Sequence, residues 1–329
     1  MEINQSITSM MRTRFETQFI TLIQQDESLL KQFVTLHPNC RGKAVELPYR
    51  GNTKMREYKD RFQKVEWDEI KFGKRTIRPR KFFNAIPLEE DDKIDLDTLT
   101  FSVADIMTEQ RAAFARTMDE VILGVIEDPI TGLYRVRTQE DGVCGGVLGI
   151  NYVGDDGSAV ENLNPKNIIP VDYCNKGTKT PAGMLIDKIA HLCTIYRQNS
   201  VFKINRGEEV VVAISPLQHE EMVLWEQSMN KNYGFQSLTN GEVNQFLGVK
   251  FLITNMLPVD AEGNRMCVAW LKSRVKFGTW KDATFRVDPR NEYIGVREQV
   301  LIKAACGATR LDNKNVFLMP CKESATAVA

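Results

Sequence analysis

The sequence has little of what marks a membrane protein or a secreted protein. No run approaches the roughly 20 apolar residues that a membrane-spanning helix requires. Residues 1–5 show neither the basic start nor the apolar stretch of a secretory signal peptide. Seven cysteines are scattered without a CxxC pair, and their odd number favours free thiols in a reducing compartment. We therefore expect synthesis in a cytoplasm and no membrane partner.

Residue patterns that carry catalysis or metal binding are also missing. The histidines His37, His191 and His219 show no HExxH or HxxxH spacing, which argues against a zinc site. His191 and Cys193 are two residues apart on a predicted helix and therefore point in different directions. The glycine-rich stretch 142–149 lacks the Lys-Ser/Thr ending of a phosphate-binding loop, and neither GxGxxG nor GxSxG occurs. We assign no catalytic, cofactor-binding or metal-binding residue, and no cofactor.

Net charge is absent as well, since 43 Lys and Arg residues balance 43 Asp and Glu residues. A protein that condenses DNA through its phosphates would show a basic excess, so this class is excluded, whereas weak non-specific contact with DNA is not. Neutrality also removes the self-repulsion that keeps many proteins apart. The composition therefore permits close association between copies of the chain.

The charge is unevenly distributed along the chain. Residues 41–81 hold fourteen basic and six acidic side chains, a net charge of +8, and residues 89–97 hold six acids and one lysine, a net charge of −5. Such segments are commonly solvated faces. The alternative is a basic extension that meets an acidic patch on a neighbouring copy. The candidates for contact between subunits are Lys74, Arg75, Arg78, Arg80, Lys81, Glu89, Glu90, Asp91 and Asp92.

Apolar periodicity in the first half predicts two helices and a hairpin. An amphipathic helix is expected over 7–34, followed by an irregular arm over 41–60. Strands Phe62–Ile70 and 76–86 around a Gly73-Lys74 turn predict a basic hairpin that its own subunit cannot satisfy. A helix over 102–127 is expected to stop at Asp128-Pro129. Its expected core residues are Phe114, Met118, Val121, Ile122 and Val125.

The second half alternates between helical and strand patterns, which together with the first half indicates an α+β protein. The predicted helices are 181–199 beginning at Pro181, 215–229 beginning at Ser215-Pro216, and 242–247. The predicted strands are 210–214, 249–254, 265–277, 296–305 and 315–321.

Several segments resemble the major capsid proteins of tailed bacteriophages. Thr108–Gly124, with Arg116-Thr117-Met118-Asp119, is similar to the central helix region of that family. The C-terminal half is similar in the order of its motifs. These motifs are Phe246-Leu247-Gly248-Val249-Lys250-Phe251, Asn255-Met256-Leu257-Pro258, Ala269-Trp270, Phe277-Gly278 and Gly307-Ala308-Thr309-Arg310-Leu311.

The resemblance, which covers most of residues 60–321, implies the Hong Kong-type major capsid fold shared with encapsulins and herpesvirus capsid floors. On that fold the extended loop lies over a neighbouring subunit. The implied parts are an N-terminal arm (1–60), an extended β-hairpin loop (61–99), a peripheral domain (100–204 and 265–321) with spine helix 102–127, an axial domain (205–264) and a C-terminal tail (322–329).

The implied function is assembly of the chain, as hexamers and pentamers, into an icosahedral phage head that encloses double-stranded DNA. The implied partners are other copies of the chain, a separate scaffolding protein, a portal, an optional decoration protein, and DNA held by weak non-specific contact. The implied location is the virion. One alternative is an encapsulin-like nanocompartment with enzyme cargo. Another is a cytosolic enzyme whose site is assembled from residues distant in sequence.

Overall fold

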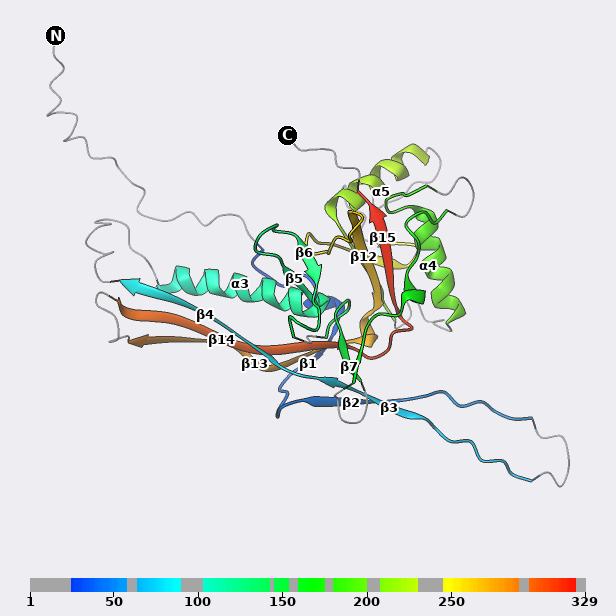
Figure 1. The fold of residues 1–329 in the computed structure, drawn as a ribbon, viewed down its shortest axis with the longest axis horizontal. Coiled ribbons are helices and arrows are strands. Elements are labelled where there is room, and N and C mark those ends of the chain that lie inside the picture. The colour runs from blue at the N-terminus through cyan, green and yellow to red at the C-terminus, as the bar shows by residue number, and fades with distance from the viewer. Residues whose placement is uncertain are drawn as a thin grey trace, which may run out of the picture. The chain divides into compact units, whose positions relative to one another are not determined.

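A computed structural model describes residues 25–57, 64–89, 103–142, 145–153, 159–174, 180–199, 208–229, 245–289 and 296–323 (Figure 1). The chain divides into two compact units. The first unit comprises Met1–Glu27, Lys81–Arg116 and Asp282–Ala304, and the second comprises Ser28–Arg80, Thr117–Lys281 and Ala305–Ala329. Both contain helix and strand, as the sequence predicts for an α+β protein.

A four-stranded sheet with the order β1-β13-β14-β4 contains the longest strands of the chain. Its members are β1 (Thr35–His37), β4 (Arg80–Glu89), β13 (Val275–Pro289) and β14 (Val296–Arg310). Helix α3 (Val103–Leu123) begins in the first unit, where Gln110 Nε2 donates to the Val300 carbonyl at 2.9 Å. Gln110 is polar but buried, and its burial is explained by this bond to the sheet's main chain.

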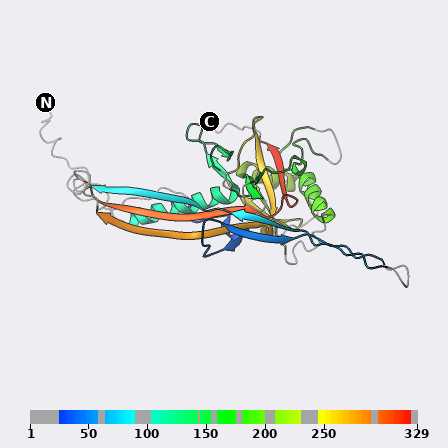
Figure 2. The ribbon, with the colours of Figure 1, turned by 60° about the horizontal axis from the view of Figure 1, so that its bottom comes forward.

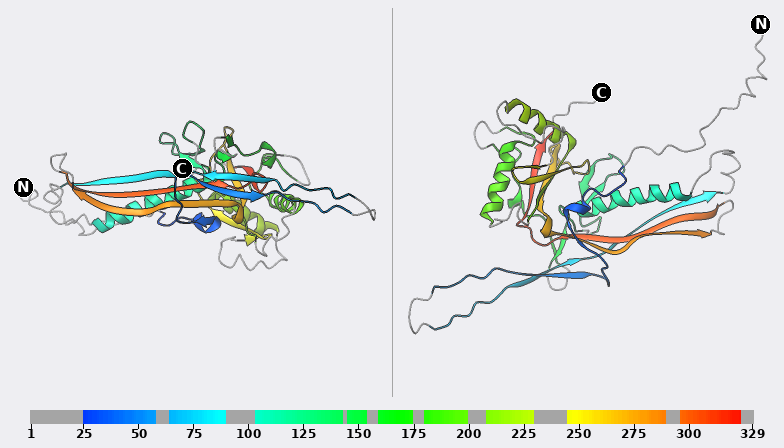
Figure 3. Two further views of the ribbon diagram at one scale, coloured as in Figure 1. Left: turned by 90° about the horizontal axis from the view of Figure 1, so that it is seen from below. Right: turned by 180° about the vertical axis from the view of Figure 1, so that it is seen from behind.

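A five-stranded sheet with the order β10-β11-β9-β12-β15 forms the core of the second unit. Its members are β9 (Val210–Ile214), β10 (Gln245–Phe246), β11 (Val249–Ile253), β12 (Asn264–Leu271) and β15 (Val316–Lys322). Helix α5 (Pro216–Met229) connects the parallel strands β9 and β11, and α4 (Ile186–Gln198) packs beside β15 (Figure 3). Every residue of β9 is buried, which explains its uninterrupted Val-Val-Val-Ala-Ile run.

The remaining elements of the second unit are short. Strands β2 (Val45–Arg50), β3 (Phe72–Ile77), β7 (Asn151–Val153) and β8 (Ala159–Glu161) form a sheet in that order. Strands β5 (Val125–Glu127) and β6 (Tyr134–Val136) form a separate hairpin. The 3-10 helices are η1 (Lys31–Phe33), η2 (Pro165–Asn167) and η4 (Lys272–Arg274).

Each of the three long described helices begins or ends close to a predicted position. Helix α5 begins at Pro216, and the Ser215 hydroxyl accepts a hydrogen bond from Gln218 N at 3.2 Å, as expected for an N-cap. Helix α3 is confirmed, but its predicted end at 127 is wrong. Gly124, with a φ of +77°, ends the helix, and the chain continues as β5. Val125 is therefore buried on a strand rather than on the helix.

Other predicted boundaries are wrong because tertiary hydrogen bonds override local patterns. Helix α4 begins at Ile186 rather than Pro181, since Met184 N donates to the Gln218 side chain at 2.6 Å and holds this segment outside the helix. The predicted strand 265–277 is interrupted by η4. Residues 245–247 of the predicted helix 242–247 form β10 and a tight turn with positive φ at Leu247 and Gly248.

The amphipathic helix predicted over 7–34 is wrong for residues 25–34, where the described chain contains η1 and no α-helix. Residues 7–24 of that prediction, and 242–244 of the helix above, lie outside the described residues.

Candidate assembly surfaces

A long hairpin (residues 45–57 and 64–77) replaces the hairpin predicted around Gly73. Strand β3 pairs with β2 in an antiparallel register that runs from Val45↔Ile77 to Arg50↔Phe72. Gly73 therefore lies inside a strand, opposite Tyr49, and is not at a turn. The predicted pairing is wrong because β3 pairs with β2. The sequence of residues 41–60 predicts an irregular arm and gives no sign of this strand. Strand β4, predicted as the second arm, instead belongs to the sheet with β14.

The register of the long hairpin continues beyond its two strands. Gly51 N donates to the Lys71 carbonyl at 2.7 Å, and Arg56 forms ion pairs with Glu66 and, at 2.6 Å, with Asp68. These contacts match the pairing of β2 with β3 extended along both arms, which places residue 56 opposite 66. Figure 2 shows the two arms beside each other past β2 and β3.

Large apolar side chains lie exposed on the long hairpin. Met55 is 101%, Trp67 90% and Val65 75% exposed. The extended register places Met55 opposite Trp67, with Val65 two residues along the same face, because side chains alternate between faces along a strand. An exposed apolar face of this kind marks a site of contact with another molecule.

The basic candidates for subunit contact do not share one hairpin. Arg75 is buried at 5% exposed and pairs with Glu161 at 2.5 Å, so its selection as a surface contact is wrong. Lys74 pairs with Glu46 at 3.0 Å, and Arg78 lies 4.2 Å from the centre of the Tyr152 ring. The premise that this segment's charges lack partners in their own chain is therefore wrong for these three residues.

The remaining charged candidates stay predictions. Arg80 donates to the Asp141 carbonyl at 3.1 Å, and Lys81 is exposed in β4. The side chain of Glu89, and the whole of Glu90, Asp91 and Asp92, lie outside the described residues.

The glycine-rich stretch is a structural loop that receives the end of α3. Val147 N and Leu148 N donate to the Ile122 and Leu123 carbonyls at 2.8 Å each, so the loop satisfies the last carbonyls of the helix. A Cβ on Gly145 would lie 1.9 Å from the Ala308 carbonyl oxygen. Only glycine permits this approach of two main chains.

Arg310, within the motif Gly307–Leu311, locks the same loop. Its Nη1 donates to the Val147 and Gly149 carbonyls at 3.0 and 2.7 Å, and its Nη2 donates to the Glu161 carbonyl at 3.1 Å. Burial lowers the pKa of Arg310 to about 10, and the positive charge of Arg75 acts in the same direction. The guanidinium remains charged at neutral pH and binds main-chain oxygens in place of water.

The Arg116-x-x-Asp119 motif of α3 binds the segment that precedes η1. Asp119 is buried, and its carboxylate accepts hydrogen bonds from Ser28 Oγ, from Leu29 N at 3.0 Å and from Leu30 N at 3.2 Å. Arg116 Nη1 donates to the Gln25 carbonyl at 3.5 Å. The sequence marks the two helix residues, but their spacing carries no information on a partner some ninety residues away.

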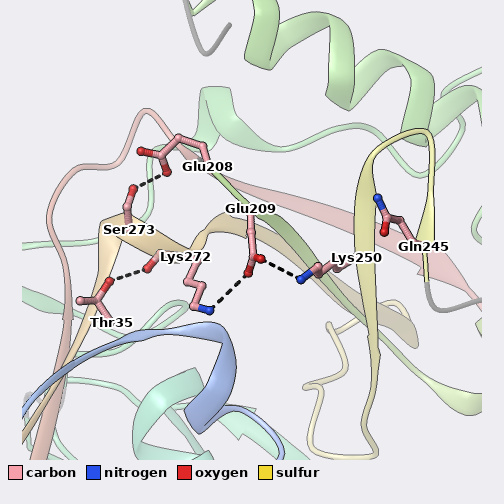
Figure 4. A pocket seen from close by; sticks show the side chains of 7 residues that line it. All are labelled: Thr35, Glu208, Glu209, Gln245, Lys250, Lys272 and Ser273. Atoms are coloured by element: carbon pink, nitrogen blue, oxygen red, sulfur yellow. Dashed lines mark hydrogen bonds and ion pairs between the residues drawn. The ribbon is translucent and has the colours of Figure 1, made fainter. Parts of the chain in front are cut away.

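An open polar pocket of about 490 Å³ lies beside the edge of the five-stranded sheet (Figure 4). Glu209 occupies its centre and pairs with Lys250 at 2.8 Å and with Lys272 at 3.3 Å. Hydrogen bonds from these lysines, Lys250 foremost, lower the pKa of Glu209. Ser273 Oγ donates to Glu208 at 2.6 Å. The described carboxylates of the pocket are therefore engaged within it, Glu209 by both lysines and Glu208 by the Ser273 hydroxyl.

Chemical sites are otherwise sparse in the described part of the chain. It contains no group of three His, Cys, Asp or Glu residues able to hold a metal ion, and its six cysteines are free thiols. His191 stacks on Tyr173 with ring centres 4.2 Å apart, and burial lowers its pKa. No described helix combines the length and apolarity needed to cross a membrane.

Comparison with known proteins identifies the family. A family model for phage capsid protein matches residues 7–323, whereas no curated protein sequence matches. The capsid structure of cyanophage P-SCSP1u is similar, with a TM-score of 0.64, 15% identity, and 97% of this chain and 95% of that chain covered. The capsid of Ralstonia phage GP4 has a TM-score of 0.66 at 6% identity, with 97% of each chain covered.

A third similar structure is the capsid of a native GTA particle, with a TM-score of 0.62, 13% identity, and 97% and 99% of the two chains covered. The shared fold agrees with the Hong Kong-type fold that the sequence resemblance implies. The chain therefore belongs to the phage capsid protein family, as a major capsid protein that forms the shell of a phage head.

Proposed function

We propose that the chain assembles as hexamers and pentamers into an icosahedral head around double-stranded DNA, and that the long hairpin docks on a neighbouring copy. The observation that carries the docking is the exposed face formed by Met55, Val65 and Trp67. Buried aromatic anchors contribute most of the binding free energy at protein interfaces. A tryptophan held in solvent by a hairpin is stabilised when a second copy covers it.

The strand pairing supports a revised domain division of the shell subunit. We assign the extended loop to residues 45–77 in place of 61–99, because β2 and β3 form its base. Strands β12 and β15 share a sheet with β9 and β11, which supports an axial domain that includes them. The N-terminal arm then precedes β2, and the peripheral domain is built on α3, β13 and β14.

Replacement of Trp67 by Ser tests the docking. A hot-spot tryptophan contributes at least about 2 kcal/mol, so the fraction of protein in shells should fall by about thirtyfold. The measurement is sedimentation of the full chain expressed in bacteria, with negative-stain electron microscopy of the fast fraction. Lys54→Ser, on the opposite face of the same hairpin, is the matched control and should assemble normally.

The melting temperature of the unassembled Trp67→Ser subunit should equal that of the wild type, because the side chain is exposed there. Normal shell yield from Trp67→Ser would contradict the docking. A wild-type chain that remains a small oligomer would contradict the whole proposal and favour an enzyme.

Packaged DNA distinguishes a phage head from an encapsulin-like compartment. Nuclease-protected double-stranded DNA is expected in heads purified from infected cells, and an enzyme cargo without DNA would support the alternative. A scaffolding protein, a portal and a decoration protein are further proposed partners, on the basis of the family, and each should co-purify with assembling heads.

A further inference from the structure

The long hairpin joins the rest of the second unit through a small root. Strand β3 pairs with β7 at two positions, Arg75↔Val153 and Thr76↔Tyr152. From Arg75 to Lys64, eleven residues of extended chain span about 36 Å. A rotation of about 10° at the root would therefore move that end of the arm by about 6 Å. Docking on a neighbouring copy requires a smaller displacement of the arm than this, because side chains at an interface core pack as closely as in a protein interior.

Arg75 connects the root to two segments outside the hairpin. Its Nε donates to the Leu311 carbonyl at 2.9 Å, just beyond the end of β14. Its Nη2 lies 2.5 Å from the carboxylate of Glu161, the last residue of β8. The charge-assisted hydrogen bond from Nε fixes direction as well as distance, and the ion pair with Glu161 adds an electrostatic attraction to a second segment.

The surroundings of this pair resist displacement. Glu161 is also bonded to Arg310, because the Glu161 carbonyl accepts a hydrogen bond from Arg310 Nη2 at 3.1 Å. Arg310 in turn is fully buried and bound to the glycine-rich loop through Val147 and Gly149. The hairpin root is therefore connected to the glycine-rich loop through Glu161 and Arg310.

We propose that Arg75 and Glu161 are positioning residues, whose ion pair sets the direction in which the long hairpin leaves the second unit and so determines where on a neighbouring copy it docks. The proposal rests on the docking function proposed above. The pair acts through the hairpin, and Trp67 and its neighbours make the contact itself.

Glu161→Gln in the full chain tests this role. The substitution preserves the size of the side chain but removes its charge, and the side chain is 41% exposed, which favours a folded subunit. We expect the fraction of protein in regular shells to fall by about tenfold, with particles of irregular size. A loss of stability alone would lower the melting temperature and the yield without changing the shell diameter, so the size distribution by cryo-electron microscopy is the deciding measurement.

Glu46→Gln is the matched control, because it removes the exposed partner of Lys74 in the same sheet. It should give shells of normal yield and size. Arg75→Lys keeps the positive charge but replaces the planar, forked guanidinium with a single nitrogen, so it should shift the size distribution as Glu161→Gln does. It provides the test should Glu161→Gln not fold.

Three outcomes decide between the proposals. Shells of wild-type yield and diameter from Glu161→Gln, with Trp67→Ser still defective, would overturn the positioning role alone. Equal defects in Glu161→Gln and Glu46→Gln would also overturn it, because the effect would then follow charge loss anywhere in the sheet. Normal assembly of Trp67→Ser would instead overturn the docking on which the inference rests.

Discussion

Replacement of Gly145 by alanine should destabilise the subunit far more than the same change at Gly132. Both glycines have positive φ, +76° and +66°, so alanine is strained at either position. That strain costs about 1–2 kcal/mol, partly offset because alanine restricts the unfolded chain, which leaves a net cost of about 1 kcal/mol. The two positions differ only in what surrounds the added Cβ.

At Gly132 nothing lies within 4 Å of the added carbon, whereas at Gly145 it would lie 1.9 Å from the Ala308 oxygen. Real Cβ contacts stay above 3.0 Å, so β14 or the loop must shift by more than 1 Å. Overpacking costs about 3 kcal/mol, and loss of the bond from Gly146 N to that oxygen, 3.1 Å long, costs about 1 kcal/mol. The total for Gly145→Ala is therefore about 5 kcal/mol.

These free energies translate into melting temperatures. The unfolding entropy is about 2.1 cal/mol/K per residue, or about 0.7 kcal/mol/K for 329 residues. Gly132→Ala should then lower the melting temperature by about 1–2 °C and Gly145→Ala by about 7 °C, measured by differential scanning fluorimetry of the unassembled full chain. Equal melting temperatures for the two variants would refute the close approach of the loop to β14.

Two further changes test buried and charged contacts of the same unit. Asp119→Asn removes one of the two carboxylate oxygens that accept hydrogen bonds from the Leu29 and Leu30 amides. It should destabilise the subunit by about 2 kcal/mol and lower the melting temperature by about 3 °C in the same assay. An unchanged melting temperature would show that these hydrogen bonds are dispensable. Hydrogen bonds from Arg135 hold the pKa of Asp141 well below its usual range. The stabilisation is present above the unfolded pKa of about 3.9 and is lost at lower pH, so the stability difference between wild type and Asp141→Asn should shrink below about pH 4. A difference that stays constant down to pH 2 would argue against this role.

Local patterns predicted the elements whose residues interact mainly with near neighbours in sequence. The apolar spacing from Ile106 to Ile122 is enough to place α3, because one helix face is buried along its length. The Val210–Ile214 strand and the Ser215-Pro216 start of α5 were also predicted from neighbouring residues, the first from its apolar run and the second from its N-cap and proline. The resemblance in motif order then led to the family that the comparisons confirm.

Long-range pairing could not be predicted in the same way. Nothing in residues 72–77 indicates that their partner is β2, because the pairing depends on contacts with a segment that is distant in sequence. Arg75 reads as a surface residue, since polar side chains are seldom buried unless main-chain or charged partners are brought to them by the fold. The structural role of the glycine-rich stretch could not be predicted, because its contacts with Ile122 and Ala308 join distant parts of the chain.

The sequence by itself determined that this is a neutral α+β protein with a long central helix and, through its motifs, that it belongs among phage capsid proteins. Periodicity and motif order are properties of the sequence, so they can be recognised without knowledge of the fold. The tertiary structure alone decided which residues form the long hairpin, that Arg75 lies buried at its root, and that Trp67 and Met55 share an exposed face. Those features depend on strand register, which is set by contacts between segments far apart in the chain.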